Sequence, residues 1–378
     1  MTPPCDAVEL TRRLIRFNTV NPPGNERECS RYLGELLQSA GFFVQYHEFA
    51  DLRTTVIARR GSDCAKKPLC FTGHVDVVPL GAQPWSVDPF GAELSEGKLF
   101  GRGSSDTKSG VAAFVAAALE QTKAIDRGPG VVLIITAGEE TGSAGAFQVA
   151  ALGAAAIGEA GAIVVAEPTG NYPLAGHKGA LWLKARTRGR TAHASVPHQG
   201  VNAVYKAARL ISKLERYGFD TPAHPLMGGP TLNVGTVSGG LNVNSVPDFA
   251  EVGIDIRIPV GIDHARLRNK LVADLAPELD ELETMLDMAG IATDPAHPWV
   301  QEVCEIMERF LGDQPKPALA PYFTDAGALT PAYGNVPTII LGPGEIEMAH
   351  QTDEWCRVSK IEQAFEAYRA IIQRWQKG

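Results

Sequence analysis

Histidine and acidic residues follow four apolar segments of the sequence, each at the point where the segment ends. They are His74 and Asp76 after LCFTG, Glu139 and Glu140 after VVLIITAG, Glu167 after AIVVA, and His350 after PTIILGPGEIEMA. Ligands bind at the carboxyl ends of the strands in open α/β sheets, so we expect these four endings to converge. Asp106 joins this set, because it lies in the loop GRGSSDTKSG just before a long apolar helical segment.

This combination of side chains predicts a metal site. Carboxylates gathered at one edge of a sheet repel one another unless a cation neutralises them. Borderline divalent ions such as zinc bind imidazole nitrogen and carboxylate oxygen, and a pair of ions about 3.5 to 4 Å apart needs about this many ligands, one of them bridging. The alternative, in which each residue separately caps a helix or pairs with an arginine, does not explain why all of them follow strands.

Three other motifs point to different chemistry, and each is weaker evidence for a function than the predicted metal site is. GRGSSD resembles the start of a dinucleotide-binding fingerprint, but its sixth position is Asp106 rather than glycine and no buried strand leads directly into it. Ser195 in HASVP lacks the G-x-S-x-G turn of a serine hydrolase. Cys70 lies within an apolar segment, where a small buried side chain is expected rather than a nucleophile.

The elements that must position these residues form two patterns. Through residue 170, short apolar segments alternate with helical patterns, which is typical of an α/β fold with a mostly parallel sheet and helices on both faces. LCF, VVLIITA and AIVVA are apolar nearly throughout, as expected of central strands. The same character returns after Pro298 in VPTIILGPG, before a closing helix over 360–375.

The segment from Gly179 has a different periodicity. LWLKARTR and AEVGIDIRIP alternate apolar and polar residues, which indicates a sheet with one covered face. The order strand, helix, strand, strand, helix, with room for a last strand, is that of a split βαβ module. We therefore predict a metal-binding catalytic domain of residues 1–178 and 293–378, and an inserted α+β domain of residues 179–292.

Composition narrows the class of protein. The 378 residues carry 35 Lys and Arg against 43 Asp and Glu, a formal net charge of −8. At this length two domains are expected, and the acidic excess argues against nucleic acid or an anionic membrane as partner. The start of the sequence has no apolar signal segment, the uncharged stretch 141–158 is too short and polar to span a membrane, and the six cysteines form no CxxC pair. We expect a cytoplasmic protein with reduced thiols.

The motifs together resemble one known family. GHVDVVP, GRGSSDTKSG, AGEETGSAG, AEPT, HKGALW, GRTAHASVPHQGVNA, GGLNVNSVPD, DIRIP and LGPGEIEMAHQTDEW follow one another over nearly the whole chain. In this order they resemble the acetylornithine deacetylase, succinyl-diaminopimelate desuccinylase and carboxypeptidase G family of dinuclear zinc amidohydrolases. AHQTDEW and AEPTGNYPLAGHKG are most similar to the acetylornithine deacetylase branch, whereas the loop YFTDAGAL is shared with many relatives of undefined substrate.

The resemblance implies a fold, cofactors and a substrate class. The fold is a zinc-exopeptidase-like catalytic domain with an inserted ferredoxin-like lid and dimerisation domain. The cofactors are two Zn²⁺ per subunit, with Co²⁺ or Mn²⁺ as substitutes, and the assembly is a homodimer through the inserted domain. The substrate is a small N-acyl-α-amino acid, N-acetylornithine above all, as in arginine biosynthesis. A desuccinylase or a carboxypeptidase or dipeptidase is the alternative, and so is a catalytically silent binding protein on the same fold.

Roles for individual residues follow from the same resemblance. One metal is held by His74, Asp106 and Glu167, and a second by Asp106, Glu140 and His350, with Asp106 as the bridge. Asp76 accepts the second ring N–H of His74 and fixes its tautomer. The peptide bond after the bridging aspartate is cis, here between Asp106 and Thr107.

The catalytic and substrate-binding roles fall to four further residues. Glu139 is the general base and acid: a carboxylate beside the metals takes a proton from water, whose pKa the ions lower from about 15.7 towards about 7, and passes it to the leaving amine. The alternative for Glu139 is a solvated or salt-bridged carboxylate. In family members the histidine that matches His193 reaches the neighbouring subunit's site and stabilises the oxyanion. The residues that match Asn244 and Arg257 bind the substrate. A surface ion pair with Asp255 is the alternative for Arg257.

Overall fold

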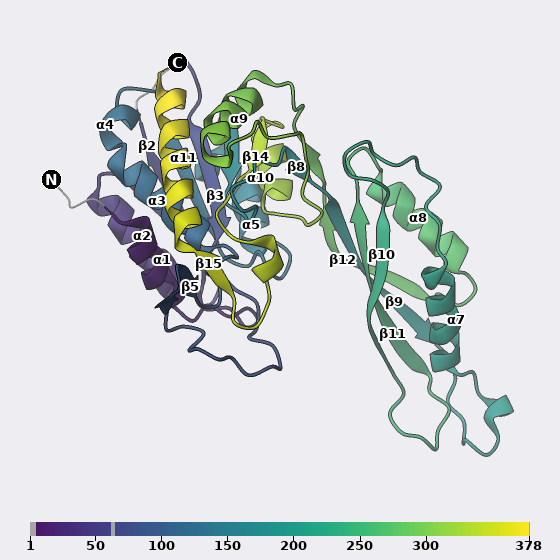
Figure 1. Cartoon of the computed structure of the whole chain (residues 1–378). Helices are drawn as coiled ribbons and strands as arrows, with labels where there is room; N and C mark the ends of the chain where they lie inside the picture. The colour runs from purple at the N-terminus through teal and green to yellow at the C-terminus, as the bar shows by residue number, and fades with distance from the viewer. Residues whose placement is uncertain (1–4, 62–64, 378) are drawn as a thin grey trace. The chain divides into compact units, whose positions relative to one another are not determined.

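The computed structural model describes residues 5–61 and 65–377, which divide into two compact units (Figure 1). The first unit contains the described residues up to Gly176, then Ala292–Ala318, and then the chain from Thr324 onwards. The second contains His177–Ile291 and Leu319–Phe323. These divisions lie within two residues of the predicted boundaries, with one difference: the sequence pattern placed 319–323 in the first domain. No helix in the described ranges combines the length and apolarity that crossing a bilayer requires.

A six-stranded sheet forms the centre of the first unit, and it is mostly parallel, as predicted. Its order is β1-β2-β6-β3-β7-β14. Neighbours among β6, β3, β7 and β14 pair in parallel, whereas β1 and β2 form an antiparallel hairpin at one edge. The strands are β1 (Phe43–Ala50), β2 (Arg53–Arg60), β3 (Leu69–His74), β6 (Val131–Thr136), β7 (Ala162–Val165) and β14 (Thr338–Ile340).

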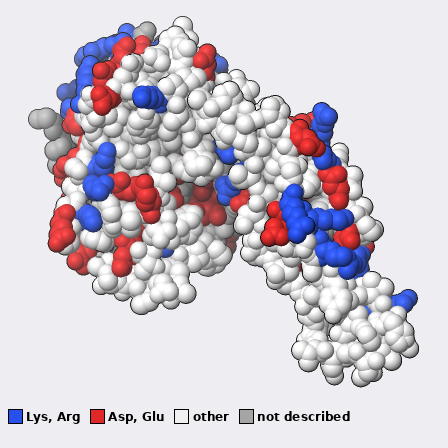
Figure 2. Space-filling model, turned by 45° about the vertical axis from the view of Figure 1, so that its right-hand side comes forward, with Lys and Arg blue, Asp and Glu red and all other residues white. Residues whose placement is uncertain are grey.

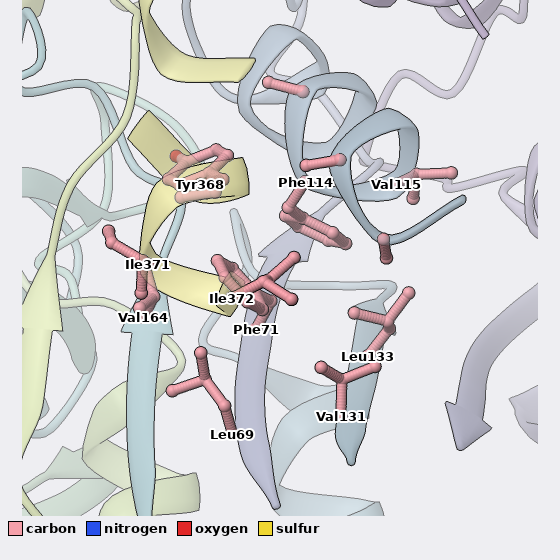
Figure 3. Close-up of a cluster of buried hydrophobic side chains, with 14 of the residues drawn as sticks. Leu69, Phe71, Phe114, Val115, Val131, Leu133, Val164, Tyr368, Ile371 and Ile372 are labelled. Atoms are coloured by element: carbon pink, nitrogen blue, oxygen red, sulfur yellow. The ribbon is translucent and has the colours of Figure 1, made fainter. Parts of the chain in front are cut away.

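Apolar segments determine where this unit has its core. Strands β3, β6 and β7 are buried at every position, which explains their nearly unbroken apolar sequences. On one face Phe71 of β3 packs against Phe114 and Tyr368, with ring centroids 5.8 and 5.4 Å apart (Figure 3). These two rings come from helices α3 (Lys108–Glu120) and α11 (Val358–Gln376).

The remaining elements of the first unit surround this sheet. Cys70 is buried within β3, as expected for a structural thiol. The uncharged stretch 141–158 contains two short helices, α5 (Ala144–Leu152) and α6 (Ala154–Ile157), which are separated at Gly153. The helices are α1 (Ala7–Ile15), α2 (Arg27–Ser39), α4 (Thr122–Ile125), α5 (Ala144–Leu152), α6 (Ala154–Ile157), α9 (Pro298–Leu311) and α10 (Ala326–Ala332). A small sheet is formed by β4 (Leu94–Ser95), β5 (Lys98–Phe100) and β15 (Trp355–Arg357). The short strands β8 (Gly176–His177) and β13 (Ile291–Ala292) pair with each other, and each contains a point where the chain passes from one unit to the other.

The second unit is a four-stranded antiparallel sheet with helices on one face. Its order is β10-β11-β9-β12, so the first strand lies between the third and the fourth, as in a split βαβ module. The alternating residues Val252, Ile254, Ile256 and Ile258 pack with the helices in one apolar cluster, as their periodicity predicts. The elements are β9 (Gly179–Arg188), α7 (Ala203–Glu215), β10 (Thr231–Gly239), β11 (Phe249–Ile258), α8 (His264–Leu275) and β12 (Glu281–Met288).

Candidate metal centre

The parallel part of the sheet brings the predicted residues to one edge. His74 is the last residue of β3, which lies between β6 and β7. Glu139 and Glu140 follow the end of β6, and Glu167 follows the end of β7. Parallel neighbours end at the same edge, so three apolar strands place these side chains together. His350 comes from the loop after β14, and Asp106 from the loop before α3.

Two groups of side chains at this edge have the geometry of a metal site. In each group one ligand atom per residue lies within 4.8 Å of the others; the groups are His74, Asp106 and Glu167, and Asp106, Glu140 and His350. Asp106 Oδ1 lies 3.2 Å from His74 Nε2, whereas Oδ2 lies 3.3 Å from His350 Nε2. One carboxylate therefore presents a different oxygen to each group, as a carboxylate does when it bridges two ions through both oxygens.

The loop that carries Asp106 is fixed by its neighbours. The peptide bond between Asp106 and Thr107 is cis, as the sequence resemblance implied. The Thr107 hydroxyl donates a hydrogen bond to the carbonyl oxygen of Ala166, the residue before Glu167. Two ligand-bearing segments are thereby tied together directly behind the site.

The residues present fit a pair of divalent cations. Glu140 Oε1 and Glu167 Oε1 are buried, and within the described parts of the chain neither has a hydrogen-bond partner. A buried carboxylate oxygen without a partner is costly unless a cation satisfies it. Two imidazoles and three carboxylates are a donor set suited to ions of the zinc type.

The electrostatics of the site lead to the same conclusion. Burial, followed by the charge of Asp106, raises the pKa of Glu140 to about 7. Burial is also the largest cause that raises the pKa values of Glu139 and Glu167 well above the usual range of a carboxyl group. Hydrogen bonds with Asp106 and Glu140 raise the pKa of His350 to about 10. The carboxylates thus repel one another strongly, and divalent cations would remove that repulsion.

The role expected of the Asp76 carboxylate needs correction. His74 Nδ1 lies 3.0 Å from the backbone carbonyl oxygen of Asp76, and 3.7 Å from its carboxylate oxygen Oδ1. Only the first distance is that of a hydrogen bond. The chain turns after β3 so that the carbonyl of residue 76, rather than its side chain, accepts the ring N–H and orients the imidazole.

The Asp76 carboxylate instead holds the turn that carries two acidic residues of the site. It accepts backbone N–H groups from Gly138, Glu139 and Glu140 at 2.9, 3.1 and 3.2 Å. Asn21 Nδ2 donates at 2.8 Å to Oδ2, the oxygen that also accepts the Glu140 N–H. Sequence reasoning did not find Asn21; its position directly before Pro22 and Pro23 marks a turn but gives no indication of this contact.

Glu139 is placed beside the ligands without being one of them. It is buried, its backbone is held by Asp76, and it belongs to neither group of candidate ligands. Its neighbour Glu140 belongs to the second group. Adjacent residues of one turn therefore differ in position: Glu140 is a candidate ligand, and Glu139 is not.

Asp325 is a further buried acid near the centre that sequence reasoning did not assign. Its Oδ2 accepts a hydrogen bond from the Thr136 hydroxyl at the end of β6, while its buried Oδ1 has no partner among the described residues. Its charge contributes to the raised pKa values of Glu139 and Glu167. The only signal in the sequence was an acidic residue directly before a short apolar helix, which is as common at helix starts as at functional sites.

The second unit brings two of its three predicted residues together. His193 forms a bridge with Ser245, and the N–H of Ala194 donates to the carbonyl of Asn244 at 3.1 Å. His193 and Asn244 thus lie on adjoining exposed loops, one after β9 and one before β11. The ring Nδ1 of His193 lies 2.7 Å from Ser195 Oγ, so the loop serine orients this imidazole.

Arg257 lies at the opposite end of β11 from those loops. Its Nη2 and Nε are 3.0 and 3.1 Å from Asp255 Oδ2, and its guanidinium lies over the ring of Phe323 at 5.3 Å. The ion pair that was the alternative interpretation is therefore formed in this structure. Both partners remain partly exposed, so Asp255 is a replaceable partner for the guanidinium.

Comparison with known proteins decides the family. Residues 70–374 match the model of Peptidase family M20/M25/M40. The chain belongs to this family. The sequence resemblance and the expectation of an amide-cleaving hydrolase from a metal-dependent family are thereby confirmed.

Relatives in this family carry two different names. The chain is 30% identical to "Acetylornithine deacetylase" of Proteus mirabilis, covering 97% of this chain and 96% of the relative. It is 32% identical to "Succinyl-diaminopimelate desuccinylase" of Cereibacter sphaeroides, covering 98% of both. The identities are nearly equal, so they favour neither branch.

Solved structures of the family share the fold. A metallo-carboxypeptidase from Sulfolobus solfataricus superimposes with a TM-score of 0.82 at 17% identity, over 99% of this chain and 100% of the other. A Bacillus subtilis protein described as a dinuclear metal binding peptidase superimposes with a TM-score of 0.69 at 16% identity, over 98% of both chains. The predicted fold, a mostly parallel α/β unit with an inserted second unit, is therefore the one that family members have.

Proposed function

We propose that this protein is a dinuclear metal hydrolase that removes the acyl group from an N-acyl-α-amino acid, with an N-acetylornithine-like compound as the leading substrate. The observation that carries the proposal is the position of Asp106, whose two carboxylate oxygens face two separate ligand groups while Glu139 stays outside both. Relatives named as a deacetylase and a desuccinylase, both nearly full-length matches, support the substrate class.

The residues that would hold the metals are those of the two groups. His74, Asp106 and Glu167 would bind one ion and Asp106, Glu140 and His350 the other, with zinc as the first candidate and cobalt or manganese as substitutes. When bound, such ions polarise the scissile carbonyl and lower the pKa of water. The Asp76 backbone carbonyl fixes the ring of His74 for this task.

Glu139 would transfer the proton. Its carboxylate takes a proton from the attacking water and then donates it to the departing amine nitrogen. Neither a charged water oxygen nor a negatively charged amine nitrogen then has to persist. Burial raises its pKa, and this effect favours the protonated form that has to donate to the amine. The bond from the Glu139 N–H to Asp76 at 3.1 Å keeps this side chain in place beside the ligands.

The inserted unit would complete the active site through a homodimer. Strand β10 is an edge of its sheet, and side chains of its second half are exposed. Val237, Leu241 and Val243 are exposed large apolar residues of this strand and the loop after it, next to Asn244. In Figure 2 the lower end of this unit is almost free of charged side chains. An exposed apolar edge of this kind is suited to pairing with a second copy, which would carry His193 to the partner subunit's site.

Mixing two inactive variants tests this arrangement. If His193 acts across the dimer, His193→Ala and Glu139→Ala proteins in equal amounts are expected to recover up to about a quarter of wild-type activity, since half the dimers are mixed and each has one intact site. Activity is measured after subunit exchange, which is verified with two differently tagged chains. Exchange without recovery would contradict the arrangement in which His193 acts in trans.

Arg257 would bind the substrate carboxylate. Its guanidinium is held by Asp255 and lies over Phe323, which leaves its second edge available for a bidentate pair. A substrate carboxylate would replace Asp255 as the partner of this guanidinium, or would bind beside it. The second oxygen of Asp255, Oδ1, is buried and has no hydrogen-bond partner among the described residues. Acetyl, succinyl and peptide substrates of this kind all release an α-amino acid, which carries such a carboxylate.

A substrate panel tests the proposed reaction. Metal-stripped protein is expected to be inactive, and protein reconstituted with zinc is expected to hydrolyse one member of a set comprising N-acetylornithine, other N-acetyl amino acids, N-succinyl-diaminopimelate and short peptides. Turnover of the succinyl compound or of a peptide alone would replace the leading substrate with one of the alternatives. No turnover with two bound metals would refute the substrate class and favour a silent binding protein.

A further inference from the structure

Glu354 is a fully buried carboxylate that the proposed reaction does not use. Its Oε1 accepts backbone N–H groups from Ser105 and Asp106 at 2.8 and 3.0 Å, and its Oε2 accepts that of Gly103 at 3.0 Å. Arg102 Nη1 donates to Oε2 at 2.8 Å. All four donors belong to the segment that ends in the bridging residue Asp106.

The same ion pair also reaches the segment that carries His350. Glu354 lies four residues after His350. Arg102 Nη1 donates at 3.1 Å to the carbonyl oxygen of Gln351, which directly follows His350. The Ser105 hydroxyl donates to the carbonyl of Trp355 at 2.8 Å. Hydrogen bonds around Glu354 therefore join residues 102–106 to residues 351–355, and each segment carries or adjoins a member of the second ligand group.

Glu354 and Asp76 make the same kind of contact, because each carboxylate accepts hydrogen bonds from backbone N–H groups of one segment near the site. Asp76 accepts three backbone N–H groups of the turn 138–140, and Glu354 accepts three from residues 103–106. Burying such a carboxylate is costly until its partners compensate for the lost hydration. Backbone N–H groups and a guanidinium are strong, directional partners, so they restrict both segments to one arrangement.

We propose that Glu354 is a positioning residue of the metal centre: it holds the Asp106 and His350 segments so that these two side chains face each other. The inference rests on the proposed metal site. The distance of 3.3 Å between Asp106 Oδ2 and His350 Nε2 is the arrangement it maintains. His350 itself is largely exposed and has positive φ, so its own packing does not fix it. Removing this support lowers metal affinity without removing a ligand.

A second buried pair in the same unit provides a matched control. Glu26 is fully buried and its Oε2 lies 2.7 Å from Arg53 Nε, as Glu354 lies beside Arg102. In the part of the chain that the structure describes, the hydrogen bonds of the Glu26 carboxylate do not reach a ligand-bearing segment. The same substitution at the two positions therefore separates loss of a buried ion pair from loss of positioning.

Zinc affinity of the full chain is the decisive measurement. Glu354→Gln is expected to lower the apparent zinc affinity about 10- to 100-fold, measured by competition with a chromophoric chelator well below the unfolding temperature. Glu26→Gln is expected to lower the thermal unfolding temperature of the metal-free chain about as much as Glu354→Gln does. It is expected to change zinc affinity far less than Glu354→Gln does, because among the described residues the Glu26 carboxylate hydrogen-bonds Arg53 and no ligand-bearing segment. Equal zinc affinity in folded Glu354→Gln and wild-type protein would overturn the proposal.

Two features keep the test decisive. If Glu354→Gln does not fold, the double variant Arg102→Gln/Glu354→Gln leaves no unpaired buried charge and is expected to show the same loss of zinc affinity. Zinc binding needs no substrate, so the result does not depend on which amide is cleaved. A wild-type chain that fails to bind two zinc ions would refute the metal centre itself, whereas two zinc ions bound equally well by wild type and variant would refute only the role of Glu354.

Discussion

Replacing Glu139 with alanine is expected to lower kcat by about 10²- to 10⁴-fold, the usual contribution of a general acid or base, while two metal ions stay bound. Glu139 belongs to neither ligand group, so the metal-binding atoms are unchanged. Its carboxylate is the group that would move a proton between water and the leaving amine. The measurement is kcat and KM at saturating zinc, together with the metal content of the same sample.

The neighbouring carboxylate is the control for this result. Glu140→Gln changes a residue of the same turn, but Glu140 Oε2 lies 3.1 Å from His350 Nε2 within the second ligand group. This variant is expected to lose metal affinity, and added zinc is expected to restore part of its activity. A Glu139 variant that keeps a near-normal rate, or that loses metal as Glu140→Gln does, would show that the two roles were assigned wrongly.

Replacing Asp106 with asparagine is expected to weaken both metal sites at once. Each of its oxygens faces a different group, and an amide offers only one oxygen, a weaker ligand without charge. At limiting zinc the bound metal is expected to fall from about two ions per chain to below about one, with activity close to background. Competition with a chelator measures the affinities, and circular dichroism verifies that the variant is folded.

A ligand that belongs to one group only provides the comparison for Asp106. Glu167→Gln alters the group of His74 and Asp106 but leaves the group of Glu140 and His350 intact. It is expected to retain one ion with near-normal affinity. If Asp106→Asn retained two ions as tightly as wild type, or lost only one as Glu167→Gln does, Asp106 would not be the bridge.

Residues of the sequence alone were sufficient for the fold class and for the candidate ligands. Unbroken apolar segments such as VVLIITA identify strands buried on both faces, and alternation in AEVGIDIRIP identifies a sheet with one covered face. These periodicities are local, so they need no knowledge of the partner strands. The ends of parallel strands share an edge, which is why His74, Glu140 and Glu167 could be grouped before their distances were known.

Other features depended on contacts between segments that are far apart in the chain. The antiparallel hairpin β1–β2 and the small sheet of β4, β5 and β15 were not predicted, because short or edge strands have weak periodicity. The grouping of residues 319–323 with the second unit likewise depends on packing, which leaves no pattern in so short a segment.

The sequence by itself therefore determined the residue types of the site, the strands that carry them and the family, since these are recorded in local patterns and motifs. Only the tertiary structure decided that the carbonyl of Asp76 orients His74, that the Asp76 carboxylate holds the turn at 138–140, and that Glu354 holds the segment of Asp106. These are hydrogen bonds from carboxylates and carbonyls to backbone or ring N–H groups, and nearly any residue can supply a backbone N–H. Such partners have no sequence signature, so they appear only when the folded chain brings them together.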